Sequence, residues 1–309
     1  MNANLTALET QEEIVCKICT INQYTKTETL MPYITVGQEN SGNIDIYYQD
    51  IGTGQPVVLI HGFPLSGHSW EKQVLVLLNQ GYRVITYDRR GFGNSSQPSF
   101  GYDYDTFAAD LNALMTKLDL RDAMLVGFSM GTGEVIRYLG KYGSERVSKA
   151  VLIAPVPPFL LKTDDNPEGV EQSVFDGIMK AIVEDRPAYF SAFLRDFFNV
   201  DVLLGDRISH EAIQASWNVA VGASAKATLD CVPSWLTDFR DDLPRIDVPT
   251  LIIHGDSDRI LPFESTAARL PQLIKNSRLV VIPGGPHAIN WTHADQINPT
   301  LLDFLQGHL

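Results

Sequence analysis

Residues 123–141 read AMLVGFSMGTGEVIRYLGK, and this stretch decides the fold. It opens with an apolar run typical of a buried strand and ends, over residues 133–141, with a helical pattern. Between the two lies Gly127-Phe128-Ser129-Met130-Gly131. The glycines leave room for a strained turn, and the start of a helix favours negative charge developing beside the serine hydroxyl. The pattern predicts that Ser129 is a nucleophile.

A neutral serine hydroxyl needs a base to accept its proton and an acid to orient that base. The acid is sought after a later strand, because parallel strands assemble sites at their carboxyl ends. Residues 251–253 form an apolar run followed by His254-Gly255-Asp256-Ser257-Asp258. Asp258 lies further out on this turn and is the favoured acid. Asp256 is the alternative, and its more ordinary role is to brace the turn.

The favoured base is His287, on the glycine-proline loop that follows the last strand, because the order nucleophile, acid, histidine then holds. Three other histidines compete. His61 and His254 stand in His-Gly pairs at strand ends, where a structural hydrogen bond is expected. His293 opens a helical segment and is expected on the surface of that helix.

Attack on a carbonyl creates an oxyanion, which needs two backbone amides directed at it. One should belong to Met130, the residue after the nucleophile. The other should come from His61-Gly62-Phe63-Pro64, the turn after the apolar run 57–60, and the amide of Phe63 is the expected donor. The side chains of Phe63 and Met130 either shape the acyl pocket or serve only in packing.

The rest of the chain alternates between predicted strands and helices, which is typical of a mostly parallel sheet covered on both faces. The fold class is therefore α/β. Strands are expected at residues 33–36, 44–49, 57–60, 83–87, 123–126, 147–153, 250–253 and 278–282. Helices are expected at residues 69–79, 104–118 and 133–141.

Between residues 155 and 233 the alternation stops, and helices are expected in succession at 170–184, 187–199 and 209–221. We interpret residues 156–233 as an inserted helical cap, and residues 31–155 and 234–309 as the core. Residues 1–30 are an N-terminal extension. Aromatic side chains of the cap should pack against the core, and some should line an apolar cavity; they are Phe175, Phe190, Phe193, Phe197, Phe198 and Trp217.

The composition argues against several functions. A formal charge of −13 makes nucleic acid an unexpected partner. The apolar runs are too short to cross a membrane, and the start of the chain has no secretory pattern, so a cytoplasmic location is expected. Cys16 and Cys19 form an isolated C-x-x-C pair with no second pair to complete a zinc site. Cys231 should be a packed, inert thiol.

Five motifs give the sequence a family resemblance. They are His61-Gly62-Phe63-Pro64-Leu65, the run YDRRGFGNS at residues 87–95, GFSMGTGE at residues 127–134, HGDSD at residues 254–258 and Gly285-Pro286-His287. From about residue 37 to residue 305, the sequence resembles the cofactor-free (non-heme) haloperoxidases and similar arylesterases of the α/β-hydrolase superfamily. That resemblance implies an eight-stranded α/β-hydrolase fold.

The resemblance also implies a Ser129-His287-Asp258 triad, an oxyanion hole at Phe63 and Met130, and no metal or organic cofactor. It implies hydrolysis of small carboxylic esters through an acyl-enzyme. A perhydrolase side reaction, in which peroxide replaces water, is implied as well, and Pro64 matches a position associated with it. A lactonase or γ-lactamase is the alternative enzyme, and a non-catalytic ligand-binding protein is the alternative outside enzymes. The sequence leaves homo-oligomer formation open.

Overall fold

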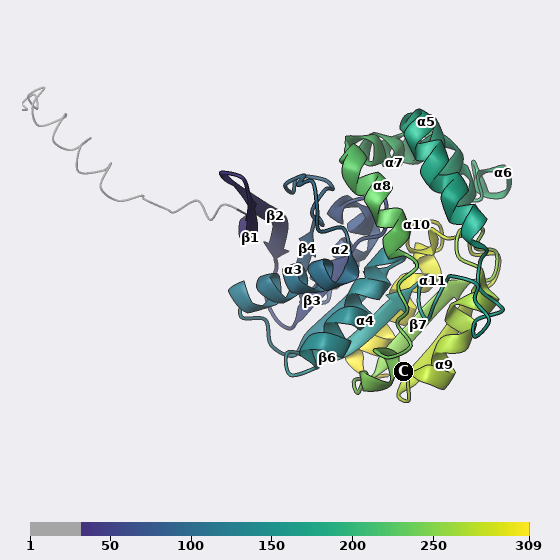
Figure 1. The fold of residues 1–309 in the computed structure, drawn as a ribbon. Coiled ribbons are helices and arrows are strands. Elements are labelled where there is room, and N and C mark those ends of the chain that lie inside the picture. Colours follow the sequence, from purple (N-terminus) through teal and green to yellow (C-terminus); the bar gives the residue numbers. More distant parts are fainter. Residues whose placement is uncertain (1–31, 309) are drawn as a thin grey trace, which may run out of the picture. The chain divides into compact units, whose positions relative to one another are not determined.

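The computed structural model describes residues 32–308, and its residues from Tyr33 onward form one compact unit. The expected eight-stranded, mostly parallel sheet is confirmed, with the order β1-β2-β4-β3-β5-β6-β7-β8 (Figure 1). Its strands are β1 (Tyr33–Glu39), β2 (Gly42–Ile51), β3 (Pro56–Ile60), β4 (Arg83–Tyr87), β5 (Ala123–Phe128), β6 (Val147–Ile153), β7 (Thr250–Gly255) and β8 (Ser277–Ile282). Antiparallel pairing joins β1 to β2 and β2 to β4, and all other pairs are parallel.

Helices connect the strands and cover the sheet. The main ones are α2 (Glu71–Asn79), α3 (Tyr104–Lys117), α4 (Met130–Tyr142), α5 (Gln172–Phe197), α7 (His210–Gly222), α8 (Ala225–Ser234) and α11 (Ala294–Gln306). Single turns form α6 (Val200–Leu203), α9 (Leu270–Leu273) and α10 (Ile289–Thr292). The described residues also contain four 3₁₀ turns: η1 (Gly67–Trp70), η2 (Leu243–Arg245), η3 (Phe263–Ser265) and η4 (Ala267–Arg269).

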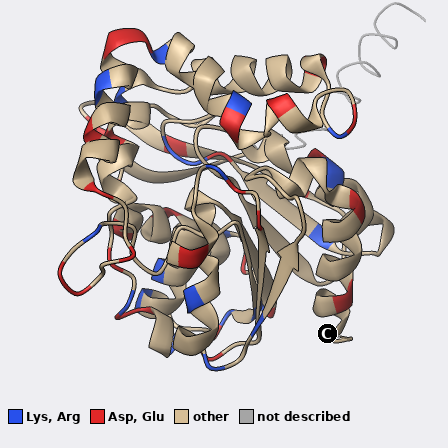
Figure 2. Cartoon of the chain, turned by 90° about the vertical axis from the view of Figure 1, so that its right-hand side faces the viewer, with Lys and Arg blue, Asp and Glu red and all other residues tan. Residues whose placement is uncertain are grey.

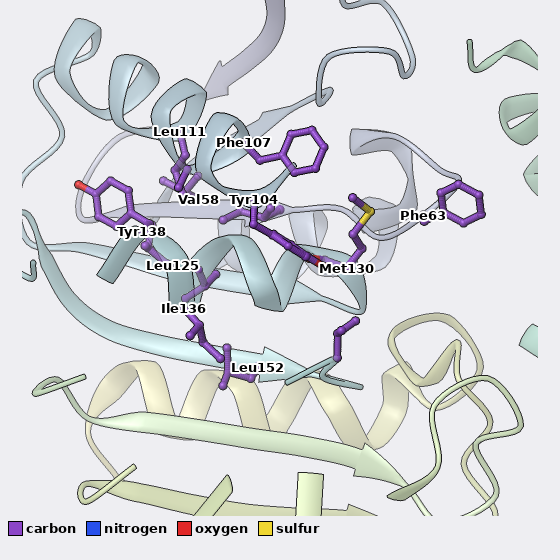
Figure 3. Close-up of a cluster of buried hydrophobic side chains, with 14 of the residues drawn as sticks. Val58, Phe63, Tyr104, Phe107, Leu111, Leu125, Met130, Ile136, Tyr138 and Leu152 are labelled. Atoms are coloured by element: carbon purple, nitrogen blue, oxygen red, sulfur yellow. The ribbon is translucent and has the colours of Figure 1, made fainter. Parts of the chain in front are cut away.

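Strand β3 shows how the core is divided between the two faces of the sheet. Val58 and Ile60 belong to the apolar cluster that includes residues of α3 and α4, whereas Val57 and Leu59 belong to the cluster that includes residues of α2 and α11. This division follows from the alternation of side chains along a strand. In Figure 3, Phe63 and Met130 lie together at one end of the first cluster. The core therefore extends to the residues expected around the nucleophile.

Four helices, α5 to α8, follow one another between β6 and β7, and Figure 1 shows α5, α7 and α8 stacked together. The two helices expected at 170–184 and 187–199 form the single element α5, which is interrupted at Asp185 by non-helical backbone angles (φ −156°, ψ 87°). Pro187 lies just after this break. A proline inside a helix removes a backbone donor, so an interruption here is expected.

The charged residues lie mostly on the helices and loops, as Figure 2 shows. Among the described residues, no helix is long and apolar enough to cross a membrane. The expected extension, residues 1–30, lies outside the described residues, and so do Cys16 and Cys19.

Candidate active site

Ser129 occupies a sharp turn between β5 and α4. Its backbone has φ 53° and ψ −121°, an angle pair that is strained for any residue other than glycine. Ser129 holds the N-cap position of α4, yet its side chain makes no capping hydrogen bond. The hydroxyl is therefore directed elsewhere. Gly131 allows this close turn, because a Cβ there would lie 3.0 Å from the carbonyl oxygen of His61.

The hydroxyl of Ser129 meets His287. Its Oγ lies 2.7 Å from Nε2 of His287, and Nδ1 of the same ring lies 2.7 Å from Oδ2 of Asp258. The side chains of His287 and Asp258 are fully buried. Since a carboxylate only accepts, the ring proton belongs on Nδ1, which leaves Nε2 free to accept the proton of Ser129. The three residues form a continuous relay.

Asp258 is held in its ionised form by several donors. Burial favours the neutral acid, but electrostatic attraction and hydrogen bonds from the rings of His287 and His254 outweigh burial and hold the pKa of Asp258 well below its usual range. The backbone amides of Ile260 and Leu261 also donate to Oδ1, at 2.8 and 2.9 Å. The carboxylate therefore presents a fixed negative charge to the imidazole.

Asp256, the alternative acid, lies on the surface of the same turn. Its Oδ1 accepts from the backbone amide of Gly284 at 2.7 Å and from the hydroxyl of Ser257 at 3.1 Å. These contacts join the turn after β7 to the loop after β8. The side chain of Asp256 bonds to Gly284 and Ser257, whereas that of Asp258 bonds to His287, so the structure brings Asp258 rather than Asp256 to the relay.

The expectation that His293 lies on a helix surface is wrong. His293 is the N-cap of α11 and is only 3% exposed, with Nδ1 2.9 Å from the hydroxyl of Thr292. The short helix α10 precedes it directly, so the chain turns at His293 and folds the ring inward. Burial, with the charge of Arg207, lowers the pKa of His293. It lies outside the relay.

The amides expected to form the oxyanion hole are both unused. Within residues 32–308, neither the backbone N–H of Phe63 nor that of Met130 donates to any other group. The turn after β3 also abuts Ser129, because a Cβ on Gly62 would lie 2.9 Å from Cβ of Ser129. Two free donors beside a serine hydroxyl can stabilise an oxyanion.

A buried ionic network supports the turn that carries Phe63. Arg89 forms an ion pair with Glu134 of α4 at 2.8 Å, and both side chains are almost fully buried. Nη2 of Arg89 donates to the carbonyl oxygen of His61 at 2.9 Å, and its backbone amide donates to Nε2 of His61 at 2.9 Å. Tyr87 donates to Glu134. Helix α4 and the turn after β3 are thereby joined.

Sequence reasoning missed this network, although Arg89 and Glu134 stand inside two of the quoted motifs. Nothing in the local pattern pairs residues 45 positions apart. The available signal was a charged residue shortly after a buried strand, Arg89, and a second one, Glu134, near the start of the helix that follows the nucleophile motif, because buried charges need partners. The network also explains His61, whose pKa is lowered well below its usual value by burial and by the charge of Arg89. His61 is a neutral structural hydrogen-bonding residue.

A cavity of about 310 Å³ opens over Ser129. Its floor includes Phe63, Ser129 and Met130, and the side chains from α5 that line it include Phe175 and Phe193. The wall is mostly apolar, and its two charged residues, Asp196 and Arg259, are partly exposed. The expectation that cap aromatics line a cavity thus holds for Phe175 and Phe193. Phe197 instead packs against the ring of His287, with centroids 5.2 Å apart.

No group of three or more His, Cys, Asp or Glu residues with metal-binding geometry occurs between residues 32 and 308. Cys231, expected to be packed and inert, is a fully buried free thiol on α8. Burial raises the pKa of this thiol, which keeps it protonated and unreactive.

Comparison with known proteins shows the family of the chain. Residues 55–294 match the family described as alpha/beta hydrolase fold. A Synechocystis sp. protein named "Putative non-heme chloroperoxidase" is 85% identical over 276 residues, which cover 89% of this chain and 100% of the relative. The bifunctional esterase/perhydrolase DCH of Acinetobacter calcoaceticus is 37% identical and covers 90% of this chain and 100% of its own length.

A solved structure supports the same placement. The crystal structure of a bromoperoxidase from Bacillus anthracis superposes with a TM-score of 0.85 and 48% sequence identity, covering 89% of this chain and 99% of that chain. Fold, sequence and site geometry therefore agree. The chain is an enzyme of the α/β-hydrolase superfamily and belongs to its family of non-heme haloperoxidases and esterases.

Proposed function

We propose that this enzyme hydrolyses small carboxylic esters through an acyl-enzyme on Ser129, with His287 as general base and Asp258 as the acid that orients it. The observation that carries the proposal is the relay of two 2.7 Å contacts from Asp258 through His287 to Ser129. The backbone of Ser129 is strained, and its hydroxyl makes no capping hydrogen bond to α4. This arrangement supplies the activated nucleophile that acyl transfer needs.

In the first half-reaction, Oγ of Ser129 attacks the ester carbonyl while Nε2 of His287 takes the hydroxyl proton. The negative charge on the former carbonyl oxygen is stabilised by the amides of Phe63 and Met130. Collapse of this intermediate breaks the bond to the alcohol, which leaves with the proton from His287. The imidazolium is stabilised meanwhile by Asp258, which stays ionised.

In the second half-reaction, His287 takes a proton from water as the water attacks the acyl-enzyme. The bond between the acyl group and Oγ then breaks, the carboxylic acid product leaves, and His287 returns the proton to Ser129. We propose hydrogen peroxide as an alternative acceptor, whose attack would release a peracid; its O–O bond stays intact and no oxidation state changes. The support is the membership of a family that includes an esterase/perhydrolase. Pro64, which directly follows the proposed oxyanion donor Phe63, agrees with this proposal.

The cavity suggests the kind of acyl group. Residues 156–233, in this proposal, form a cap whose helix α5 supplies much of the cavity wall. About 310 Å³ of mostly apolar space fits a small uncharged acyl chain or ring. A small-molecule ester is therefore the proposed partner of the site.

The test compares wild type and Ser129→Ala on p-nitrophenyl acetate. The wild type should release p-nitrophenol with turnover, and Ser129→Ala should fall by at least about a thousandfold. Equal rates for the two proteins would contradict the proposal. A second arm adds hydrogen peroxide to the same ester and measures peracetic acid, which should form only when Ser129 is present. A panel of lactones and γ-lactams, on the same two proteins, measures the competing activities.

A further inference from the structure

His254 is a second histidine at the catalytic acid. It stands at the carboxyl end of β7, four residues before Asp258, and its side chain is fully buried. Nε2 of His254 lies 3.1 Å from the carbonyl oxygen of Leu261 and 3.2 Å from Oδ2 of Asp258. Oδ2 is the same oxygen that accepts from His287. His254 therefore contacts the acid directly, and nothing in the proposed mechanism uses it.

The neighbours of His254 fix the position of its proton. A backbone carbonyl and an ionised carboxylate can only accept, so the ring must carry hydrogen on Nε2. Nδ1 is buried and has no hydrogen-bond partner among residues 32–308. One face of the ring packs against Phe263, with centroids 5.7 Å apart. The ring thus presents a single N–H to the acid loop and otherwise lies in apolar surroundings.

The contacts of His254 close the loop that holds the acid. The amide of Leu261 donates to Oδ1 of Asp258 at 2.9 Å, and the carbonyl of Leu261 accepts from His254. Residue 261 is therefore held from both sides. Since Oδ1 is fixed by backbone amides, the orientation of Oδ2 depends on the two imidazole rings that face it.

On the basis of the proposed role of Asp258, we propose that His254 is a positioning residue for the catalytic acid: its Nε2–H holds the 258–261 loop and Oδ2 of Asp258 where they orient His287. The arrangement is a four-member relay in which the acid lies between two histidines with different tasks. His287 exchanges protons with Ser129, whereas His254 keeps its proton on Nε2 throughout.

The charges around the acid are few. Among the described residues, the titratable side chains in contact with the carboxylate of Asp258 are His254 and His287. Arg259 is next in the chain, but its guanidinium pairs with Asp201 at 2.6 Å and is partly exposed. Oδ2 shares its negative charge between two N–H groups. If the N–H of His254 is removed, the negative charge of Oδ2 should act on His287 alone and favour the protonated form of His287.

The test uses His254→Leu, which removes the donor, and His254→Gln, whose side-chain amide can place an N–H near the original Nε2. His254→Leu should lower kcat by about tenfold to a hundredfold, the scale expected when an orienting group is displaced, with KM almost unchanged. The acidic limb of the kcat/KM profile should move to higher pH. His254→Gln should recover most of kcat and the wild-type limb. His293→Gln, a buried histidine outside the relay, is the matched control and should leave both unchanged.

A wild-type kcat and pH profile in His254→Leu would overturn the proposal, and so would a His254→Gln variant that is as slow as His254→Leu. If His254→Leu does not fold, His254→Asn replaces it, because its amide is one methylene too short to reach Leu261. Proton NMR gives a readout without turnover. The low-field signal of the His287 Nδ1 proton should shift in the Leu or Asn variant and return in His254→Gln.

The same experiment separates this proposal from the proposed function. Absence of any Ser129-dependent turnover in the wild type would defeat the esterase assignment alone. The NMR comparison would then decide the positioning role by itself, and an unchanged His287 signal in His254→Leu would overturn it.

Discussion

Replacing Asp258 by asparagine tests the assignment of the acid most directly. Oδ1 accepts from the amides of Ile260 and Leu261 at 2.8 and 2.9 Å, so the carboxamide oxygen of the variant should take that position. The NH₂ group then replaces Oδ2 and faces the ring nitrogen of His287. Because two donors cannot pair, His287 should adopt the tautomer with its proton on Nε2, which cannot accept from Ser129.

The expected loss is large, because the wrong tautomer removes the base and the imidazolium loses its counter-charge. We expect kcat to fall by about 10³- to 10⁴-fold, which corresponds to about 4 to 5.5 kcal/mol of transition-state stabilisation. KM should change little, since Asp258 is not itself among the residues that line the cavity. The assay is steady-state hydrolysis of p-nitrophenyl acetate on protein whose melting temperature is known.

Asp256→Asn is the matched control, two residues away on the same turn. Its Oδ1 can still accept from Gly284 after substitution, and the side chain is exposed. We expect kcat within about threefold of wild type and a stability change within about 0.5 kcal/mol, as for surface substitutions. A larger loss in Asp256→Asn than in Asp258→Asn would transfer the acid to Asp256 and refute the tautomer argument.

Four further outcomes are expected. Activity should require the neutral form of His287, because only the neutral ring accepts the proton of Ser129, and a rate that does not fall on acidification would contradict its proposed role as base. Glu134→Gln should lower the free energy of unfolding by about 3 to 5 kcal/mol in urea titrations, because the buried guanidinium of Arg89 loses its counter-charge. Gly131→Ala should cost more free energy in kcat than in the free energy of unfolding, because its Cβ would press on the backbone of Ile60 and His61, just before Phe63. A variant with wild-type kcat would contradict that packing. His61 has a lowered pKa when folded, so the unfolded chain binds its proton first, and stability should fall as pH drops below about 6.5, by up to about 1.4 kcal/mol per unit. His61→Gln should flatten that slope in urea titrations at several pH values.

The sharp turn at Ser129 could be predicted from the sequence because its signal is local. An apolar strand, a serine between glycines and a helical pattern all occur within residues 123–141, and each follows from nearest-neighbour sterics and periodicity. The strands were found for the same reason. Their ends shifted by one to a few residues, because hydrogen bonding continues where the apolar pattern has already stopped, as at Gly42–Ile51.

Features that depend on contacts between distant segments could not be predicted. For the acid, the sequence favoured Asp258 over Asp256 without excluding either, because the path of the backbone decides which one faces His287. The Arg89–Glu134 pair joins two segments through the core, and no periodicity announces it. His293 was misplaced because its helix was expected to begin on the surface, whereas the preceding turn of α10 brings the ring inside.

Both His-Gly pairs of the sequence lie at strand ends, and each histidine supports a different loop of the site. His61 accepts from the backbone of Arg89 beside the turn that carries Phe63, and His254 donates to the loop that carries Asp258. The hydrogen bonds of both histidines join residues outside the segment α5–α8. The groups that stabilise charge are therefore fixed by buried polar contacts, as electrostatic preorganisation requires. The cavity wall, in contrast, is made largely of apolar side chains that can change size without breaking a hydrogen bond. Substitutions at Phe175 or Phe193 should accordingly alter which acyl group is accepted while leaving the pH dependence of the reaction intact.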